Sequence, residues 1–338
     1  MGGEFLPQPR KACGDRSAGQ AGDFGDLRPR MAFEPQQDDL RIEQRKRAYN
    51  AVQASEGVAF CHREAHMTED EAGAPEYFTG GARLCPVDGP LGRIDPANLD
   101  TAIARYPAEF VHSGRPMAIS VTQATEIGTV YGLDDLDAVA DVARRHGLPL
   151  HMDGARFANA AAFLDVSAAE AAGDVDALSF GCVKNGGMSA EAIVFFDSAL
   201  ADVARYRRKR AGHLQSKGRF LAAQLHAMIE DDVWLDNARH ANAAAQEIAR
   251  ACGERLMHPV EANELFVRCT AAERDTLRAL GFGFYDWGAD AARFVTAWNT
   301  RDEDARALAQ AVAALWTRQA RRRASLPRAT SPHSCWSA

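Results

Sequence analysis

The chain has 338 residues, of which 46% are hydrophobic, and a formal net charge of -7. This length can bury a substantial core, most simply as a large domain followed by a smaller one. The negative charge argues against a nucleic-acid partner, since phosphate contacts favour basic surfaces. No apolar run approaches the length of a membrane span, and the N-terminus lacks the apolar core of a signal peptide. We therefore expect no membrane partner.

Seven cysteines are scattered without CxxC pairing or metal-ligand spacing. An odd count does not suggest a disulfide framework, so we expect a reducing cytoplasm and no metal site. Cys182 could be a redox-sensitive thiol. The favoured interpretation is a packing residue, because buried free cysteine behaves as a small hydrophobe.

The pattern along the chain changes near residue 57. Residues 1–57 are rich in Gly, Pro, Gln, Arg and Asp, a composition that predicts disorder. Apolar runs then alternate with helical periods such as 134–146, and this alternation predicts a largely parallel, doubly wound sheet in a large α/β domain over 58–212. The strand candidates are VAFC, ARLCPV, PMAISVT, LPLHM, ALSFG and AIVFF.

The C-terminal third of the chain predicts a smaller α+β domain over 213–320. A helix expected at 198–210 ends the large domain. The small domain is expected to hold helices at 218–230 and 233–251, then strands in ELFVRC, FGFYDW and ARFVTAW, and a helix at 302–318. The segment 321–338 is basic and bears Ser and Pro, so we expect a disordered tail.

Two runs in the middle of the chain carry the most informative residues. LHMDGARFANA holds Asp153 and Arg156, and LSFGCVKNGG holds Lys184. Asp153 and Lys184 each follow a predicted buried strand, and ligands of open α/β sheets bind outside the carboxyl ends of strands, so we expect both in one crevice. Together they supply what pyridoxal phosphate (PLP) needs, an acid for its pyridine nitrogen and an amine for its aldehyde.

Each of these residues also has a plainer interpretation. Lys184 would form the Schiff base with PLP, as a neutral and accessible lysine can, but its flanking glycines also suit a solvated loop lysine. Asp153 would keep the pyridine nitrogen protonated, or it could be a helix N-cap. The pair favours the cofactor role. For Arg156, a contact with the cofactor or the substrate carboxylate and a surface ion pair stay equally open.

Two further residues are candidates for the same site. His66, in EAHMTEDEAGAPEYF, could stack on the cofactor ring, with Glu71 fixing its tautomer and charge; a helix cap or a packed core histidine is the alternative. Arg293, in ARFVTAW, could pair with the substrate carboxylate through two parallel hydrogen bonds. An edge-strand arginine facing water fits its spacing equally well.

Four motifs then occur in order: the AH-x4-EAGAPE run, HMDGAR, SFGCVKNGG and RFVTAW. Together they resemble the threonine aldolase and β-eliminating lyase family of fold-type I PLP enzymes, and most of all its bacterial low-specificity branch acting on threonine and phenylserine-like amino acids. The resemblance covers residues 57 to 316 and implies a fold-type I transferase-like α/β fold. It also implies a homotetramer or homodimer with active sites at subunit interfaces, where Lys217 of the run RRKRAGHLQSKGRF would reach a neighbouring subunit's phosphate.

Carried over by motif, the resemblance implies a role for each candidate residue. Lys184 is the Schiff-base lysine and Asp153 is the partner of the pyridine nitrogen. His66 stacks on the ring, while Arg156 and Arg293 lie on the carboxylate side.

The sequence departs from the family in two places. Many members carry a histidine near the substrate hydroxyl in a run like ENTHN, where this chain has TQATE, residues 122–126; His66 is then the remaining candidate for the base. The family also has a glycine-rich loop that opens a helix and cradles the phosphate with backbone N–H groups. No such loop precedes Val58, which suggests a frameshifted or mis-started reading frame and a loosely held cofactor.

The resemblance implies an aldolase that uses PLP to cleave β-hydroxy-α-amino acids, of the threonine or phenylserine type, to glycine and an aldehyde. A β-eliminating lyase or an aminotransferase would use the same Lys184 and Asp153, so both stay open. A catalytically impaired remnant that lacks the phosphate-binding loop is the third possibility. The preferred aldehyde and the stereochemistry at Cβ do not follow from the sequence.

Overall fold

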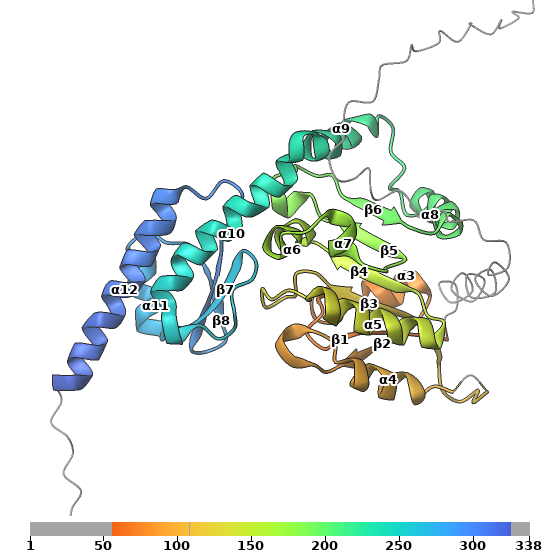
Figure 1. Cartoon of the computed structure of the whole chain (residues 1–338), viewed down its shortest axis with the longest axis horizontal. Helices are drawn as coiled ribbons and strands as arrows, with labels where there is room; N and C mark the ends of the chain where they lie inside the picture. The colour runs from red at the N-terminus through yellow and green to blue at the C-terminus, as the bar shows by residue number, and fades with distance from the viewer. Residues whose placement is uncertain (1–55, 108, 326–338) are drawn as a thin grey trace, which may run out of the picture.

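The structure is a computed structural model that describes residues 56–107 and 109–325, with side chains described as far as residue 317. The segment expected to be disordered lies outside these residues, apart from its last two, and so does 326–338 of the expected tail. Figure 1 shows a larger α/β unit beside a smaller unit, with one long helix, α10, passing from one to the other. None of the described helices is long and apolar enough to cross a membrane.

A six-stranded sheet forms the centre of the larger unit, in the order β2-β1-β3-β4-β5-β6. Its strands are parallel except β6, which pairs antiparallel with β5. All six expected strands are confirmed, as is the largely parallel sheet. The strands are β1 (Gly57–His62), β2 (Arg83–Val87), β3 (Arg115–Thr122), β4 (Leu150–Gly154), β5 (Ala177–Phe180) and β6 (Ala192–Phe195).

Helices and short turns connect these strands. The helix expected at 134–146 is α5, whose buried residues include Leu136 and Val139, and Gly147 ends it with a left-handed φ of 62°. These connections are α2 (His66–Glu69), α3 (Ala74–Thr79), η2 (Pro90–Gly92), α4 (Pro96–Ala104), α5 (Leu133–His146), α6 (Phe157–Leu164), α7 (Ala168–Ala172) and η3 (Val183–Asn185). Two further helices, α8 (Ser198–Arg210) and α9 (Arg219–Ile229), follow the last strand, β6.

The smaller unit is a three-stranded antiparallel sheet, ordered β7-β9-β8, with helices packed against it. It confirms the predicted α+β character of the C-terminal part. Its helix α12 continues to Ser325, through the first five residues of the expected tail. The elements are η4 (Glu230–Asp232), α10 (Val233–Cys252), η5 (Gly253–Arg255), β7 (Glu264–Arg268), α11 (Ala271–Ala279), β8 (Tyr285–Trp287), β9 (Ala291–Val295) and α12 (Asp302–Ser325).

Helix α10 joins the two hydrophobic cores. Its first turns place Trp234 and Leu235 in the core of the larger unit, while Ala245 and Ile248 belong to the core of the smaller one. The ring of Trp234 stacks on Phe157 with 6.2 Å between ring centroids. The small sheet is therefore held against the large one by a helix that contributes to both interiors.

Candidate active site

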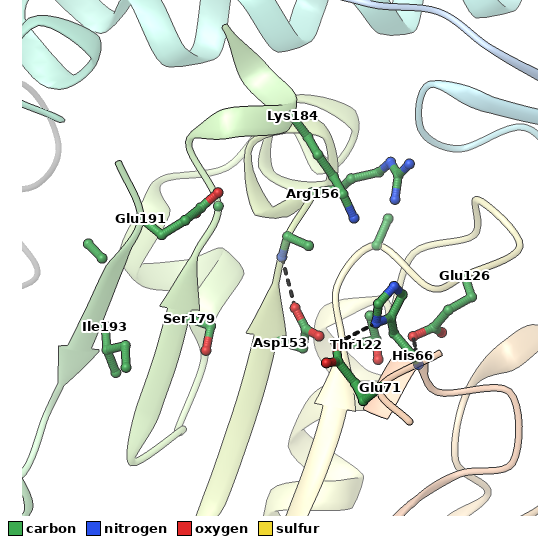
Figure 2. Close-up of a pocket in the computed structure, with 14 residues that line it drawn as sticks. His66, Glu71, Thr122, Glu126, Asp153, Arg156, Ser179, Lys184, Glu191 and Ile193 are labelled. Atoms are coloured by element: carbon green, nitrogen blue, oxygen red, sulfur yellow. Dashed lines mark hydrogen bonds and ion pairs between the residues drawn. The ribbon is translucent and has the colours of Figure 1, made fainter. Parts of the chain in front are cut away.

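A cavity of about 360 Å³ opens at the carboxyl ends of the parallel strands. The strand order reverses at β1, which lies between β2 and β3, and ligands of open α/β sheets bind at such a switch point. Figure 2 shows side chains from several strand ends converging on this cavity. The polar and charged side chains that line it are His66, Glu71, Thr122, Glu126, Asp153, Arg156, Ser179, Lys184 and Glu191.

Two glycines allow the ends of β4 and β5 to lie close together. A Cβ on Gly154 would come 2.6 Å from the carbonyl oxygen of Ser179, and one on Gly181 would come 2.5 Å from that of Ala155. Neither distance is possible for a real side chain, so both positions need glycine. The close approach brings Asp153, at the end of β4, and Lys184, in η3 after β5, to one cavity.

Hydrogen bonds hold the turn η3 on both sides of Lys184. Glu191 accepts hydrogen bonds from the backbone N–H groups of Cys182 and Val183, at 2.8 Å and 3.1 Å. The side-chain amide of Asn185 donates to the carbonyl of Trp234 at 2.7 Å. These contacts fix the backbone immediately around the lysine.

The amine of Lys184 lies in a setting that favours its neutral form. The side chain is open to the cavity, yet the surrounding protein is close enough for burial to lower its pKa, and the guanidinium of Arg156 lowers it further. Of the three lysines in the described part of the chain, Lys184 alone lines the cavity; Lys209 and Lys217 are exposed on α8 and on the loop before α9. A neutral, accessible amine is what a nucleophilic lysine requires.

Asp153 lies on the same face of the sheet as a buried row of hydrogen-bonded side chains, Ser120, His151 and Ser179. Its Oδ1 accepts the backbone N–H of Ala155 at 3.0 Å. His151 comes two residues before Asp153 in β4. Its Nδ1 lies 2.9 Å from Oγ of Ser120, and its Nε2 lies 2.9 Å from Oγ of Ser179. Burial lowers the pKa of His151, which favours the neutral imidazole.

His66 reaches the cavity from the start of α2, just beyond β1. Its Nδ1 lies 2.7 Å from Oε1 of Glu71, the partner expected from the sequence. Its backbone N–H donates to Oε1 of Glu126 at 2.8 Å. The imidazole is thus oriented by one carboxylate, and the backbone that carries it is held by another.

Arg156 and Arg293 meet at a buried carboxylate between the two units. Both guanidinium groups bind Oε1 of Glu264, which is fully buried on β7. Arg156 also donates from Nε to the side chain of Asn263 at 3.1 Å. Arg156 lines the cavity, whereas Arg293, on β9, does not.

The structure therefore gathers Lys184, Asp153, His66 and Arg156 at one cavity and places Arg293 in contact with the same carboxylate as Arg156. Cys182 is buried beside Gly187, in agreement with a packing role. Lys217 does not line the cavity, and within the described residues no cluster of metal-ligating side chains occurs.

Sequence reasoning missed several residues that the fold brings to the site, namely Glu126, Ser179, Glu191 and Glu264. Glu126 ends the TQATE run after a predicted strand, and that position was the available signal. Glu264 opens a strand whose next three residues, Leu265, Phe266 and Val267, are apolar and buried, and a carboxylate in such a place is rarely buried without a partner.

Comparison with known proteins decides the family. The sequence model of the β-eliminating lyase family matches residues 46–272, more than half of the chain. The chain belongs to this family. The resemblance found in the four motifs is confirmed, and the protein is a lyase of the threonine aldolase and β-eliminating lyase group.

Individual relatives of this lyase point the same way. The low specificity L-threonine aldolase of Pseudomonas aeruginosa is 44% identical over 258 residues, covering 74% of each chain. An enzyme of the same name from a Pseudomonas species is 41% identical over 263 residues, covering 75% of each chain. Among solved structures, a Leishmania major threonine aldolase superposes with a TM-score of 0.73 at 26% identity, covering 80% of this lyase and 81% of that chain.

Proposed function

We propose that this lyase is a PLP-dependent aldolase that cleaves β-hydroxy-α-amino acids of the threonine or phenylserine type to glycine and an aldehyde. The observation that carries the proposal is that Lys184 and Asp153 line the same cavity at the carboxyl edge of the sheet. The names of the relatives with 44% and 41% identity support the choice of reaction.

The residues of the cavity fit a pyridoxal cofactor. The amine of Lys184 has a lowered pKa, as bond formation with an aldehyde requires. Asp153 offers a carboxylate near the floor of the cavity, where it would pair with the pyridine nitrogen. When bound, PLP supplies an electron sink for the pair left on Cα after the Cα–Cβ bond breaks.

The other side chains have distinct tasks in this proposal. The imidazole of His66, oriented by Glu71, would cover one face of the cofactor ring. Arg156 and Arg293 would attract the substrate carboxylate, since guanidinium groups bind carboxylates with two parallel hydrogen bonds. Glu264 keeps the two cations together in the absence of substrate.

We further propose a homodimer or homotetramer in a reducing cytoplasm. Met188 and Ile193, close to Lys184 in the chain, are 83% and 62% exposed, and large apolar side chains exposed together favour contact with another copy. A neighbouring subunit would bring Lys217 toward the phosphate. Five cysteines of the described residues are buried and unpaired, which suits a reducing compartment.

Product analysis tests the proposed reaction. The purified chain, supplied with PLP, is incubated with L-threonine, L-allo-threonine and phenylserine, and all products are quantified. Aldol cleavage gives glycine and an aldehyde in equal amounts, whereas β-elimination gives a keto acid with ammonia and transamination consumes an added keto acid. Only the first result supports the proposal, and no turnover at all would favour the impaired remnant.

A further inference from the structure

Glu126 is an acidic residue on the cavity wall that has no chemical role in the function proposed above. It follows β3 in the run TQATE, residues 122–126, and lines the cavity. Figure 2 shows its carboxyl group beside His66 and Thr122, on the same side of the cavity as Asp153. It therefore shares the wall of the cavity with His66 and Thr122.

The two carboxylate oxygens of Glu126 differ in their contacts. Oε1 accepts the backbone N–H of His66 at 2.8 Å. Oε2 is inaccessible to solvent and has no hydrogen-bond partner within the part of the chain that the structure describes. The terminal torsion of a glutamate is broad, so the carboxyl group can turn its unpartnered oxygen toward a ligand. A buried acceptor without a donor is costly, and a ligand hydroxyl would satisfy it.

The electrostatic setting of Glu126 suits proton transfer. Burial raises its pKa, and the carboxylate of Asp153 raises it as well, while the hydrogen bond from the backbone N–H of His66 acts in the opposite direction. A carboxyl group whose pKa moves toward neutrality exchanges protons efficiently at neutral pH. The titratable and charged groups that interact with it are Cys61, Tyr131, Asp153 and Arg156.

His66, by contrast, is already engaged. Its Nδ1 is bound to Glu71, and its side chain is 45% exposed. An imidazole held in this way suits a ring that covers the cofactor, which leaves the hydroxyl proton to another group. The alternative task of Glu126, holding the backbone of His66, uses only one of its oxygens.

We propose that Glu126 is the catalytic residue that accepts the proton of the substrate β-hydroxyl. The inference rests on the proposed aldol cleavage. As the Cα–Cβ bond breaks, the O–H electron pair becomes the second bond of the aldehyde carbonyl and the proton passes to the carboxylate of Glu126. The Cα–Cβ pair stays on the Cα side, where a proton completes glycine, and Glu126 returns its proton to solvent.

The substitution Glu126→Gln separates the two tasks. Glutamine keeps the carbonyl oxygen that accepts the N–H of His66 but cannot take a proton. We expect threonine cleavage to fall roughly 100-fold or more, the usual range for loss of a general base. Exchange of the glycine α-proton with deuterated water, which involves no hydroxyl, is expected to stay within about twofold. Glu69→Gln, an exposed position on α2, is the matched control and should alter neither rate.

A second measurement does not depend on turnover. In the cofactor-free chain, carbon-13 NMR of labelled glutamate side chains, with the Glu126 signal assigned by its loss in Glu126→Gln, should show this carboxyl titrating above the ordinary glutamate range. Cleavage by Glu126→Gln at the unaltered rate, equal loss of cleavage and glycine exchange, or an ordinary titration would each overturn the assignment. Failure of the proposed function is distinct, because the unaltered chain would then not cleave threonine, and it would overturn this inference too.

Discussion

Arg156 and Arg293 bind the same carboxylate oxygen, Oε1 of Glu264, although Arg156 follows β4 of the large sheet and Arg293 lies in β9 of the small one. The carboxylate is fully buried, and it compensates two guanidinium groups that are mostly buried, Arg156 at 11% and Arg293 at 26% side-chain exposure. This contact links the two units through Arg156, which also lines the cavity. It places both guanidinium groups on one side of the site, where a substrate carboxylate would be attracted.

Arg293 still has a donor to offer, because its Nε is buried with no hydrogen-bond partner among the described residues. Arg293→Gln should raise KM for threonine by roughly 10- to 100-fold, the equivalent of about 1.5–3 kcal/mol for a lost charge-assisted contact. Steady-state kinetics measure the effect, with the exposed Arg268→Gln as control. An unchanged KM would mean that Arg293 serves only to neutralise Glu264.

Removing the shared carboxylate should destabilise the fold. Glu264→Ala leaves two guanidinium groups without their buried partner, and breaking a buried ion pair costs about 3–5 kcal/mol of unfolding free energy. Urea unfolding measures this loss, and Glu303→Ala, an exposed ion-pair residue on α12, should change it by less than about 1 kcal/mol. Equal stability of the two variants would show that the cluster does not hold the units together.

Asp153→Asn should slow cleavage while leaving the shape of the site intact. The substitution removes the charge that would hold a proton on the pyridine nitrogen, a contact worth about 1.5–3 kcal/mol. In a barrier, that energy corresponds to roughly one to two decades of rate. Single-turnover kinetics at saturating PLP measure it. An unaltered rate would reduce Asp153 to the residue that accepts the N–H of Ala155.

Much of this site could be predicted from the sequence because its parts follow apolar strands. Asp153 and Lys184 each come directly after such a strand, and parallel strands deliver their carboxyl ends to one edge. The positions of Glu126 and Glu264 could not be predicted in this way. Their roles depend on contacts between segments far apart in the chain, such as Glu126 with His66 and Glu264 with Arg156.

The antiparallel direction of β6 could not be predicted from the sequence either. Its run AIVFF follows β5 after a short connection, and apolar content alone does not give direction. Sequence spacing likewise could not separate a water-facing Arg293 from the partly buried Arg293 that the structure shows. The position of the Arg293 side chain depends on its ion pair with Glu264, which lies in the neighbouring strand β7.

The lowered pKa of Lys184 predicts an amine that reacts at lower pH than other lysines. A larger fraction of this amine is neutral at a given pH, since burial and Arg156 both disfavour its charged form. In the cofactor-free chain, labelling with an amine-reactive reagent at about pH 6 to 8 should modify Lys184 before Lys209 and Lys217. Mass spectrometry of the peptides measures the order. Faster labelling of the two exposed lysines would contradict the electrostatic account of the cavity.

The proposed function is tested most directly by finding which lysine carries the cofactor. The purified chain is loaded with PLP, reduced with borohydride and digested, and the modified peptide is identified by mass spectrometry. We predict that PLP is fixed to Lys184, and that Lys184→Ala loses both the label and the visible absorbance while Lys217→Ala still carries the label on Lys184. Labelling at another lysine, or an unchanged absorbance in Lys184→Ala, would contradict the account.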